Sequence, residues 1–119
     1  MIDHLEVYSD KVPTMVAFYA RVLGILGYTQ KVSGRTNGFG TETMLDFFVA
    51  EGSPGQHVHF AFAARDRATV DRIYADARTA GFVLDRAPAL APHIHPNYYA
   101  GYLRDPDGRL VEFVCHKPE

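Results

Sequence analysis

The sequence has little or none of several features that mark particular classes of protein. Its 119 residues contain one cysteine and no tryptophan, so no disulfide can form within the chain. A single thiol agrees with a reducing cytosol. Twelve Lys and Arg residues stand against fourteen Asp and Glu, and they are scattered rather than clustered. Because phosphate backbones require clustered cations, we expect no nucleic-acid partner.

Long apolar runs are also absent. No run approaches membrane-spanning length, and the N-terminal residues lack the basic and apolar regions of an export signal. The sequence therefore predicts a cytoplasmic protein without a membrane partner. Apolar residues make up 47% and charged residues 22%, as in an ordinary globular domain. We expect one domain over residues 1–119, and we find no Gly-x-Ser-x-Gly, His-Glu-x-x-His or Cys-x-x-Cys motif.

What the chain does contain is one unit that occurs twice. His4 and His59 each lie in an apolar, strand-like segment, and Tyr19 follows the first histidine at the same spacing as Tyr74 follows the second. A duplicated fold can bring residues from both copies to one centre.

Each copy also carries a carboxylate in a strand-like segment. Leu45-Asp46-Phe47 matches Val111-Glu112-Phe113, which makes Asp46 and Glu112 equivalent. Two histidines and two carboxylates form the donor set of a divalent metal bound by nitrogen and oxygen. The repeat therefore predicts one metal site.

Apolar periodicity predicts two helices, one capped by Ser9 or Asp10 and ending near Gly24 and Gly27, and one over residues 67–80. Strands are expected at 2–8, 28–32, 44–50, 57–63, 82–86, 98–104 and 109–115. Residues 33–43 and 88–96 are expected to be loops, and 51–56 a linker between the halves. A turn at Asp105-Pro106-Asp107-Gly108 joins the last two strands, because Pro presets its φ and Gly supplies a positive φ.

Four motifs stand out together: Ile2-Asp3-His4, Phe18-Tyr19, Leu23-Gly24 and the run from Tyr102 to Gly108 that leads to Glu112. In these motifs the sequence resembles the vicinal oxygen chelate superfamily, which includes glyoxalase I, extradiol dioxygenases, and fosfomycin and bleomycin resistance proteins. The resemblance implies an α+β fold of tandem β-α-β-β-β modules, at about 1–51 and 56–117, whose curved mixed sheets form a metal-binding cup. It also implies a homodimer.

The resemblance implies one divalent metal ion (Fe, Zn, Ni, Mn or Mg) with His4, His59 and Glu112 as ligands and Asp46 at the fourth position. Asp46 is one methylene shorter than the Glu usual there, so a water-bridged role is the alternative. His57 is a substitute ligand or a solvated residue. For Glu112, the alternative is an ion pair with Arg86 or Arg104.

The resemblance to extradiol dioxygenases also suggests catalytic roles for His95 and Tyr102 beside Glu112. A surface loop accounts equally well for His95. Four protein ligands would favour glyoxalase-type proton transfer, and a set of two histidines and one carboxylate would favour iron(II) oxygen chemistry. The expected function is thus a metal-dependent lyase, isomerase or dioxygenase whose small-molecule substrate chelates the metal through two adjacent oxygens. The alternatives are a non-enzymatic protein that sequesters a drug-like ligand and a thiol transferase that confers resistance.

Overall fold

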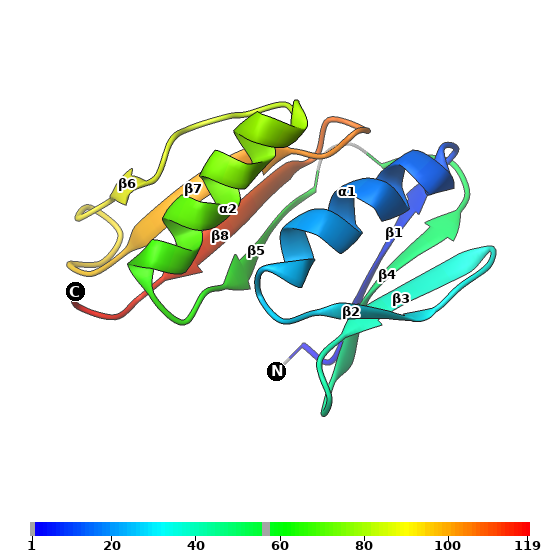
Figure 1. Ribbon diagram of the computed structural model, residues 1–119, viewed down its shortest axis with the longest axis horizontal. Coiled ribbons are helices and arrows are strands. Elements are labelled where there is room, and N and C mark those ends of the chain that lie inside the picture. The colour runs from blue at the N-terminus through cyan, green and yellow to red at the C-terminus, as the bar shows by residue number, and fades with distance from the viewer. Residues whose placement is uncertain (1, 56–57) are drawn as a thin grey trace. The chain divides into compact units, whose positions relative to one another are not determined.

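The computed structural model describes residues 2–55 and 58–119, and the chain folds as two compact units, 1–56 and 57–119 (Figure 1). Each unit contains one long helix and one four-stranded mixed sheet in the order β-α-β-β-β. The predicted α+β fold with tandem modules is therefore confirmed. In the described part of the chain, no helix has both the length and the apolar character that crossing a membrane would require.

The first unit has its sheet in the order β1-β4-β3-β2, with β1 parallel to β4 and the other neighbours antiparallel. Its elements are β1 (Leu5–Ser9), α1 (Val12–Gly24), β2 (Thr29–Val32), β3 (Thr36–Gly40) and β4 (Leu45–Glu51). The buried face of α1 packs on the sheet, where the rings of Tyr19 and Phe47 lie 4.6 Å apart between centroids.

The start of α1 differs from the prediction. Lys11 is the N-cap residue, and no side chain caps the helix. Ser9 instead accepts a hydrogen bond from the Lys11 N–H at 3.0 Å, so it lies two residues before the N-cap position. Pro13 in the first turn lacks an N–H and has a fixed φ, which suits this position without a side-chain cap. The predicted caps, Ser9 and Asp10, were therefore wrong.

Strand β3 lies inside residues 33–43, which we predicted to be a loop, so that prediction was wrong. Its glycines permit a close approach to β4. A Cβ on Gly40 would lie 1.9 Å from the Met44 carbonyl oxygen, and one on Gly38 would lie 3.0 Å from the Phe48 ring. Glycine at these positions marks a strand with no space for side chains rather than a loop.

The second unit repeats the arrangement, with the sheet order β5-β8-β7-β6 and β5 parallel to β8. Its elements are β5 (His59–Ala63), α2 (Arg67–Ala80), β6 (Ala89–Leu90), β7 (Tyr99–Arg104) and β8 (Leu110–Cys115). Helix α2 lies over β7 and β8 (Figure 1). It begins at its cap Asp66, which accepts the Thr69 N–H at 2.8 Å, and ends at Gly81 with φ 76°. The predicted helix over 67–80 is confirmed.

Residues 82–86, predicted as a strand, form only an isolated bridge between Leu84 and Leu103. The Asp85 carboxylate accepts the N–H of Arg86 at 2.9 Å, and such local hydrogen bonds compete with a regular ladder. The segment still runs along β7, because the Arg104 N–H donates to the Val83 carbonyl at 3.0 Å. The short β6 lies inside residues 88–96, which we predicted to be a loop, so that prediction was wrong in part.

The turn at residues 105–108 is confirmed. Gly108 has φ 88°, and its N–H donates to the Asp105 carbonyl at 2.8 Å. Arg109, at 1% exposure, lies next to the turn and pairs with the Asp105 and Asp107 carboxylates at 3.2 and 3.1 Å. These buried ion pairs hold the start of β8, the strand that carries Glu112.

Candidate functional site

The strand registers show which residues of the two units are equivalent. In the first unit the residue two places after His4 pairs with Phe48, and in the second the residue two places after His59 pairs with Glu112. Phe48 is therefore the counterpart of Glu112. The predicted match of Asp46 to Glu112 was wrong by two residues along the strand.

His59 and Glu112 meet in the second unit. Nε2 of His59 lies 2.9 Å from Oε1 of Glu112, while the hydroxyl of Tyr98 donates to Oε2. The Glu112 side chain is 4% exposed, and the His59 side chain is 51% exposed. The pair thus joins a buried carboxylate to an imidazole that solvent can reach.

The pair lies on the face of the sheet away from α2. A Cβ on Gly101 of β7 would touch Val70 of α2, so the neighbouring Tyr102 points to the opposite face. Tyr102 pairs directly with Glu112 across β7 and β8, and its ring centroid lies 6.2 Å from that of His59. The predicted site residues His59, Glu112 and Tyr102 are therefore neighbours.

The predicted alternative for Glu112, an ion pair with arginine, does not occur among the described residues. Arg104 Nε binds the Asp85 carboxylate at 3.0 Å, and the guanidinium of Arg86 lies on the ring of Tyr102. The partners of Glu112 are an imidazole and a phenol.

Both phenols beside Glu112 keep their protons at neutral pH. Burial raises the pKa of Tyr98, and its hydrogen bond to Glu112 raises it further. Burial and the negative charge of Glu112 also raise the pKa of Tyr102. The two tyrosines are therefore hydrogen-bond donors around the carboxylate.

In the first unit, His4 and Asp46 have separate partners. His4 Nδ1 lies 2.8 Å from Asp3 Oδ1, and its ring meets the edge of Phe48 at 5.6 Å between centroids. Oδ2 of Asp46 accepts from the Tyr28 hydroxyl at 3.0 Å, whereas its Oδ1 is buried and has no hydrogen-bond partner in the described part of the chain. That oxygen is a vacant acceptor for a water or an ion.

His95 is not brought into contact with Glu112. Its Nδ1 accepts the Asn97 N–H at 3.1 Å, and its ring lies 5.6 Å from that of His116. The His116 ring in turn lies 5.0 Å from that of Tyr98. Two ring contacts therefore separate His95 from the tyrosine that binds Glu112. The other candidate, His57, lies outside the described residues.

Tyr98 is the residue that the sequence analysis missed. The turn at residues 105–108 fixes the pairing of β7 with β8 and sets Tyr102 opposite Glu112. A residue four places before Tyr102 lies on the same face of the strand. The turn and this alternation together were a signal that could have identified Tyr98.

The donor atoms of the pair fit a divalent metal. An imidazole nitrogen and a carboxylate oxygen converge, and both are ligands of zinc and iron. No third His, Cys, Asp or Glu joins them to form a recognisable metal-binding group within residues 2–55 and 58–119. The pair would therefore supply two ligands to a metal and leave the others to come from elsewhere.

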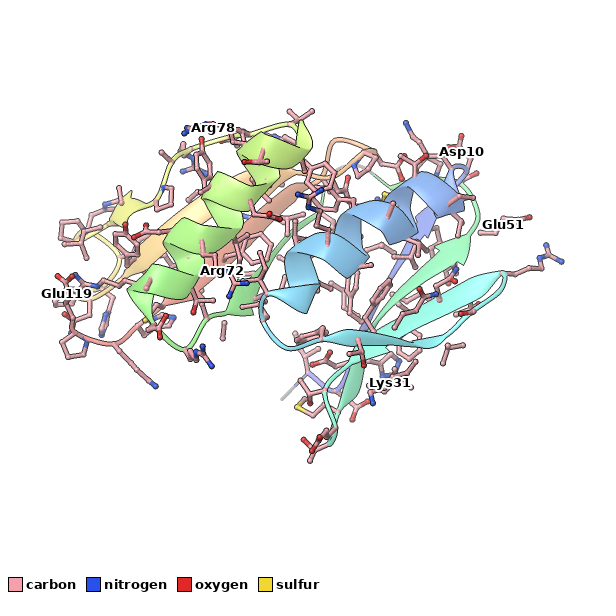
Figure 2. All side chains as sticks on the ribbon, in the orientation of Figure 1. Asp10, Lys31, Glu51, Arg72, Arg78 and Glu119 are labelled. Atoms are coloured by element: carbon pink, nitrogen blue, oxygen red, sulfur yellow. The ribbon has the colours of Figure 1, made fainter. Side chains whose placement is uncertain are left out.

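Among the described residues, each unit also has a cavity that is lined by residues other than the pair. One of about 260 Å³ opens at the start of α2 and is lined by Arg67, Cys115 and Lys117 among others. One of about 310 Å³ in the first unit is lined in part by Asp10 and Glu51, which lie at the same end of that unit in Figure 2. Neither cavity includes His59 or Glu112, so neither defines the site.

A comparison with families of known proteins decides the relationship. The sequence profile described as the Glyoxalase/Bleomycin resistance protein/Dioxygenase superfamily matches residues 1–113. The chain belongs to this superfamily. The predicted resemblance is thereby confirmed. No protein in the curated set matches the chain.

Solved structures of the superfamily share the fold. A glyoxalase/bleomycin resistance protein from Albidiferax ferrireducens is 22% identical, with a TM-score of 0.80 and 99% of both chains covered. A lactoylglutathione lyase from Agrobacterium tumefaciens is 25% identical, with a TM-score of 0.72 over 97% of this chain and 92% of that one. A glyoxalase/bleomycin resistance protein/dioxygenase family enzyme from Burkholderia phytofirmans is 18% identical, with a TM-score of 0.75 over 97% and 98%. These likenesses extend over nearly the whole chain.

Proposed function

We propose that this chain is a divalent-metal-dependent enzyme that acts on a small molecule with two adjacent oxygens. The observation that carries the proposal is the convergence of His59 Nε2 and Glu112 Oε1 at 2.9 Å, with the carboxylate almost fully buried. A buried carboxylate needs a cation or hydrogen-bond donors, and a shared metal meets that need for both side chains.

The ligand set that we propose is His4, His59 and Glu112. Phe48, the counterpart of Glu112, has no donor atom, so the internal symmetry supplies no fourth ligand. Asp46 is on the same face as Phe48, and its vacant Oδ1 suits a role through a bound water. The participation of His4 and Asp46 is a prediction that mutagenesis tests.

Two histidines and one carboxylate leave open coordination positions and are typical of iron(II) oxygenases. We therefore favour a dioxygenase-type reaction over a glyoxalase-type reaction. When bound, iron(II) would supply Lewis-acid and oxygen chemistry to a substrate chelated through its two oxygens.

The side chains of the protein have defined tasks in this proposal. The Tyr98 hydroxyl holds Oε2 of Glu112, so that Oε1 alone points toward His59. Tyr102 stays protonated beside the pair and donates a hydrogen bond to a substrate oxygen. His95 contacts His116 rather than Glu112, so its proposed role is limited to relaying protons between solvent and the site.

Metal content and oxygen consumption test this function together. Protein freed of metal with a chelator is expected to take up one iron(II) per chain and then to consume oxygen with catecholic substrates. His59→Ala should abolish both, while His93→Ala, in an exposed loop position, should leave both unchanged. Failure of the wild type to bind any divalent metal would contradict the proposal.

A non-enzymatic ligand-binding protein is the second candidate. Both oxygens of Glu112 have partners within the chain, so the fold satisfies this carboxylate without a metal. This candidate predicts that metal-free protein binds aromatic ligands as tightly as metal-treated protein. A thiol transferase would instead consume an epoxide only when both metal and thiol are present.

A further inference from the structure

Arg86 is an exposed cation that a buried aromatic ring holds in place. Its guanidinium carbon lies 3.8 Å from the centroid of the Tyr102 ring, which is well within cation–π range. Tyr102 is only 8% exposed, while the Arg86 side chain is 63% exposed. The ring therefore fixes the guanidinium, and solvent can still reach the charge.

The backbone fixes Arg86 as well. The Tyr102 N–H donates to the Arg86 carbonyl at 3.0 Å, and the Asp85 N–H donates to the Tyr102 carbonyl at 3.0 Å. These hydrogen bonds pin residues 85 and 86 to β7. The backbone of Arg86 is held by these hydrogen bonds and its guanidinium by the Tyr102 ring, so the side chain loses little conformational freedom when it binds a ligand.

The terminal nitrogens of Arg86 have no hydrogen-bond partner among the described residues. Only Nε approaches a carboxylate, the Asp85 Oδ1, at 3.4 Å. Asp85 is meanwhile bound more closely by Arg104 Nε, at 3.0 Å. The two terminal nitrogens of Arg86, here called its fork, are therefore available to bind another anion.

The fork of Arg86 stands next to the proposed metal ligands. Tyr102 contacts Arg86, and on the same strand pair it lies opposite Glu112, with His59 6.2 Å away between ring centroids. A small molecule at His59 and Glu112 therefore lies one aromatic ring away from a cation. Arginine binds carboxylates through two parallel hydrogen bonds.

We propose that Arg86 is a specificity-determining residue that binds a carboxylate of the substrate, which makes the substrate a small organic acid. This inference rests on the proposed function, because it places the adjacent oxygens of the substrate at His59 and Glu112. The carboxylate is a separate group from the two chelating oxygens.

Calorimetric titration with two matched probes tests the inference. The probes are 3,4-dihydroxybenzoate and its neutral amide, 3,4-dihydroxybenzamide, which share the same pair of oxygens. The wild type should bind the acid about tenfold or more tightly than the amide, as one charge-assisted bidentate contact gives. In Arg86→Met the preference should vanish, with the affinity for the amide unchanged, and Arg86→Lys should restore part of it.

Arg78→Met is the matched control. Arg78 is also stacked on a tyrosine, with its guanidinium 5.5 Å from the centroid of Tyr74, but it lies on α2 (Figure 2) and so on the other side of the sheet. The affinity of this variant for both probes should equal that of the wild type. An equal loss in Arg78→Met would make the effect one of overall charge and would overturn the proposal.

An NMR titration of the wild-type protein tests the contact with Arg86 even if a variant does not fold. The Nε–H signal of Arg86 in an NMR spectrum should shift on titration with the acid and stay in place with the amide. Equal affinities of the wild type for the two probes, or no binding of the acid, would overturn the inference. Because the titrations are run on both metal-free and metal-loaded protein, failure to bind metal is seen separately from failure to select the acid.

Discussion

At the scale of single residues, the site depends on how the chain satisfies one buried carboxylate. Glu112 is 3% exposed, and its two oxygens are bound by His59 and Tyr98. Removal of a donor from a buried charge costs more than the hydrogen bond contributes, because the charge stays desolvated. Tyr98 therefore matters both for stability and for the direction in which Glu112 points.

Tyr98→Phe should lower the free energy of unfolding by about 1–3 kcal/mol, since Oε2 of Glu112 loses its donor. It should also weaken metal binding about 10–100-fold, as loss of a hydrogen bond to a ligand does. Urea unfolding and metal titration measure the two effects. Tyr99→Phe is the control, because the Tyr99 hydroxyl binds the exposed Asp71 instead. Equal effects of the two substitutions would contradict the role of Tyr98.

Tyr28 gives a prediction about pH. Burial, together with the hydrogen bond to Asp46, raises its pKa from 10.0 to about 12. Because the folded value is the higher one, this contribution to stability is complete below pH 10 and is lost as the pH rises toward 12. The Cζ resonance of Tyr28 should therefore titrate near 12. In Asp46→Asn its midpoint should fall but stay above 10.0, and an unchanged midpoint would show that the contact does not exist in solution.

Residue identities were easier to predict than residue positions. His59, Glu112 and Tyr102 were all predicted, and they are neighbours in the structure. Asp46 was wrongly matched to Glu112 as its equivalent in the other copy, because positions two apart on a strand face the same way and alternation cannot separate them. Only the register of β1 with β4 shows that Phe48 is the counterpart of Glu112.

At the scale of elements, helices were predicted better than short strands. The helix at 67–80 has both a capping Asp66 and a terminal Gly81, so local sequence defines each of its ends. Strand β3 has neither signal, since its glycines are required by close packing against β4, which no local pattern reveals. The segment 82–86 runs alongside β7 without forming a regular strand, because the Asp85 carboxylate accepts a hydrogen bond from the backbone N–H of Arg86.

Substitution of two glycines by alanine tests whether the backbone at each position is closely packed or has space for a side chain. Gly40→Ala should lower the free energy of unfolding by about 3 kcal/mol or more, because its Cβ would collide with the backbone of Met44. Gly24→Ala, at the end of α1 with nothing within 4 Å of its Cβ, should raise it by about 0.4–1 kcal/mol. Denaturant unfolding measures both changes. A neutral Gly40→Ala would mean that β3 and β4 are not packed as described.

At the scale of the whole molecule, the duplication explains what the two units share and where they differ. His59 begins β5, and His4 immediately precedes β1; in each unit, the residue two places after the histidine pairs with a residue of the parallel neighbouring strand. In one unit that partner is Phe48 and in the other Glu112, so the two copies have diverged at the position of the proposed metal-binding carboxylate. The superfamily was predictable from a few motifs, but this divergence needed the strand registers.

We also propose that the chain forms a homodimer, as the resemblance to the superfamily implies. Sedimentation velocity should give a mass twice the 13.3 kDa of the chain. A species of 13.3 kDa at micromolar concentration would contradict the dimer while leaving the metal proposal intact.

The most direct test of the account is a crystal structure of the whole chain grown with Zn²⁺, with anomalous data collected at the zinc edge. We predict a single peak within about 2.0–2.2 Å of both His59 Nε2 and Glu112 Oε1. Absence of a peak there, with the two atoms still 2.9 Å apart in a direct hydrogen bond, would contradict the proposed metal centre.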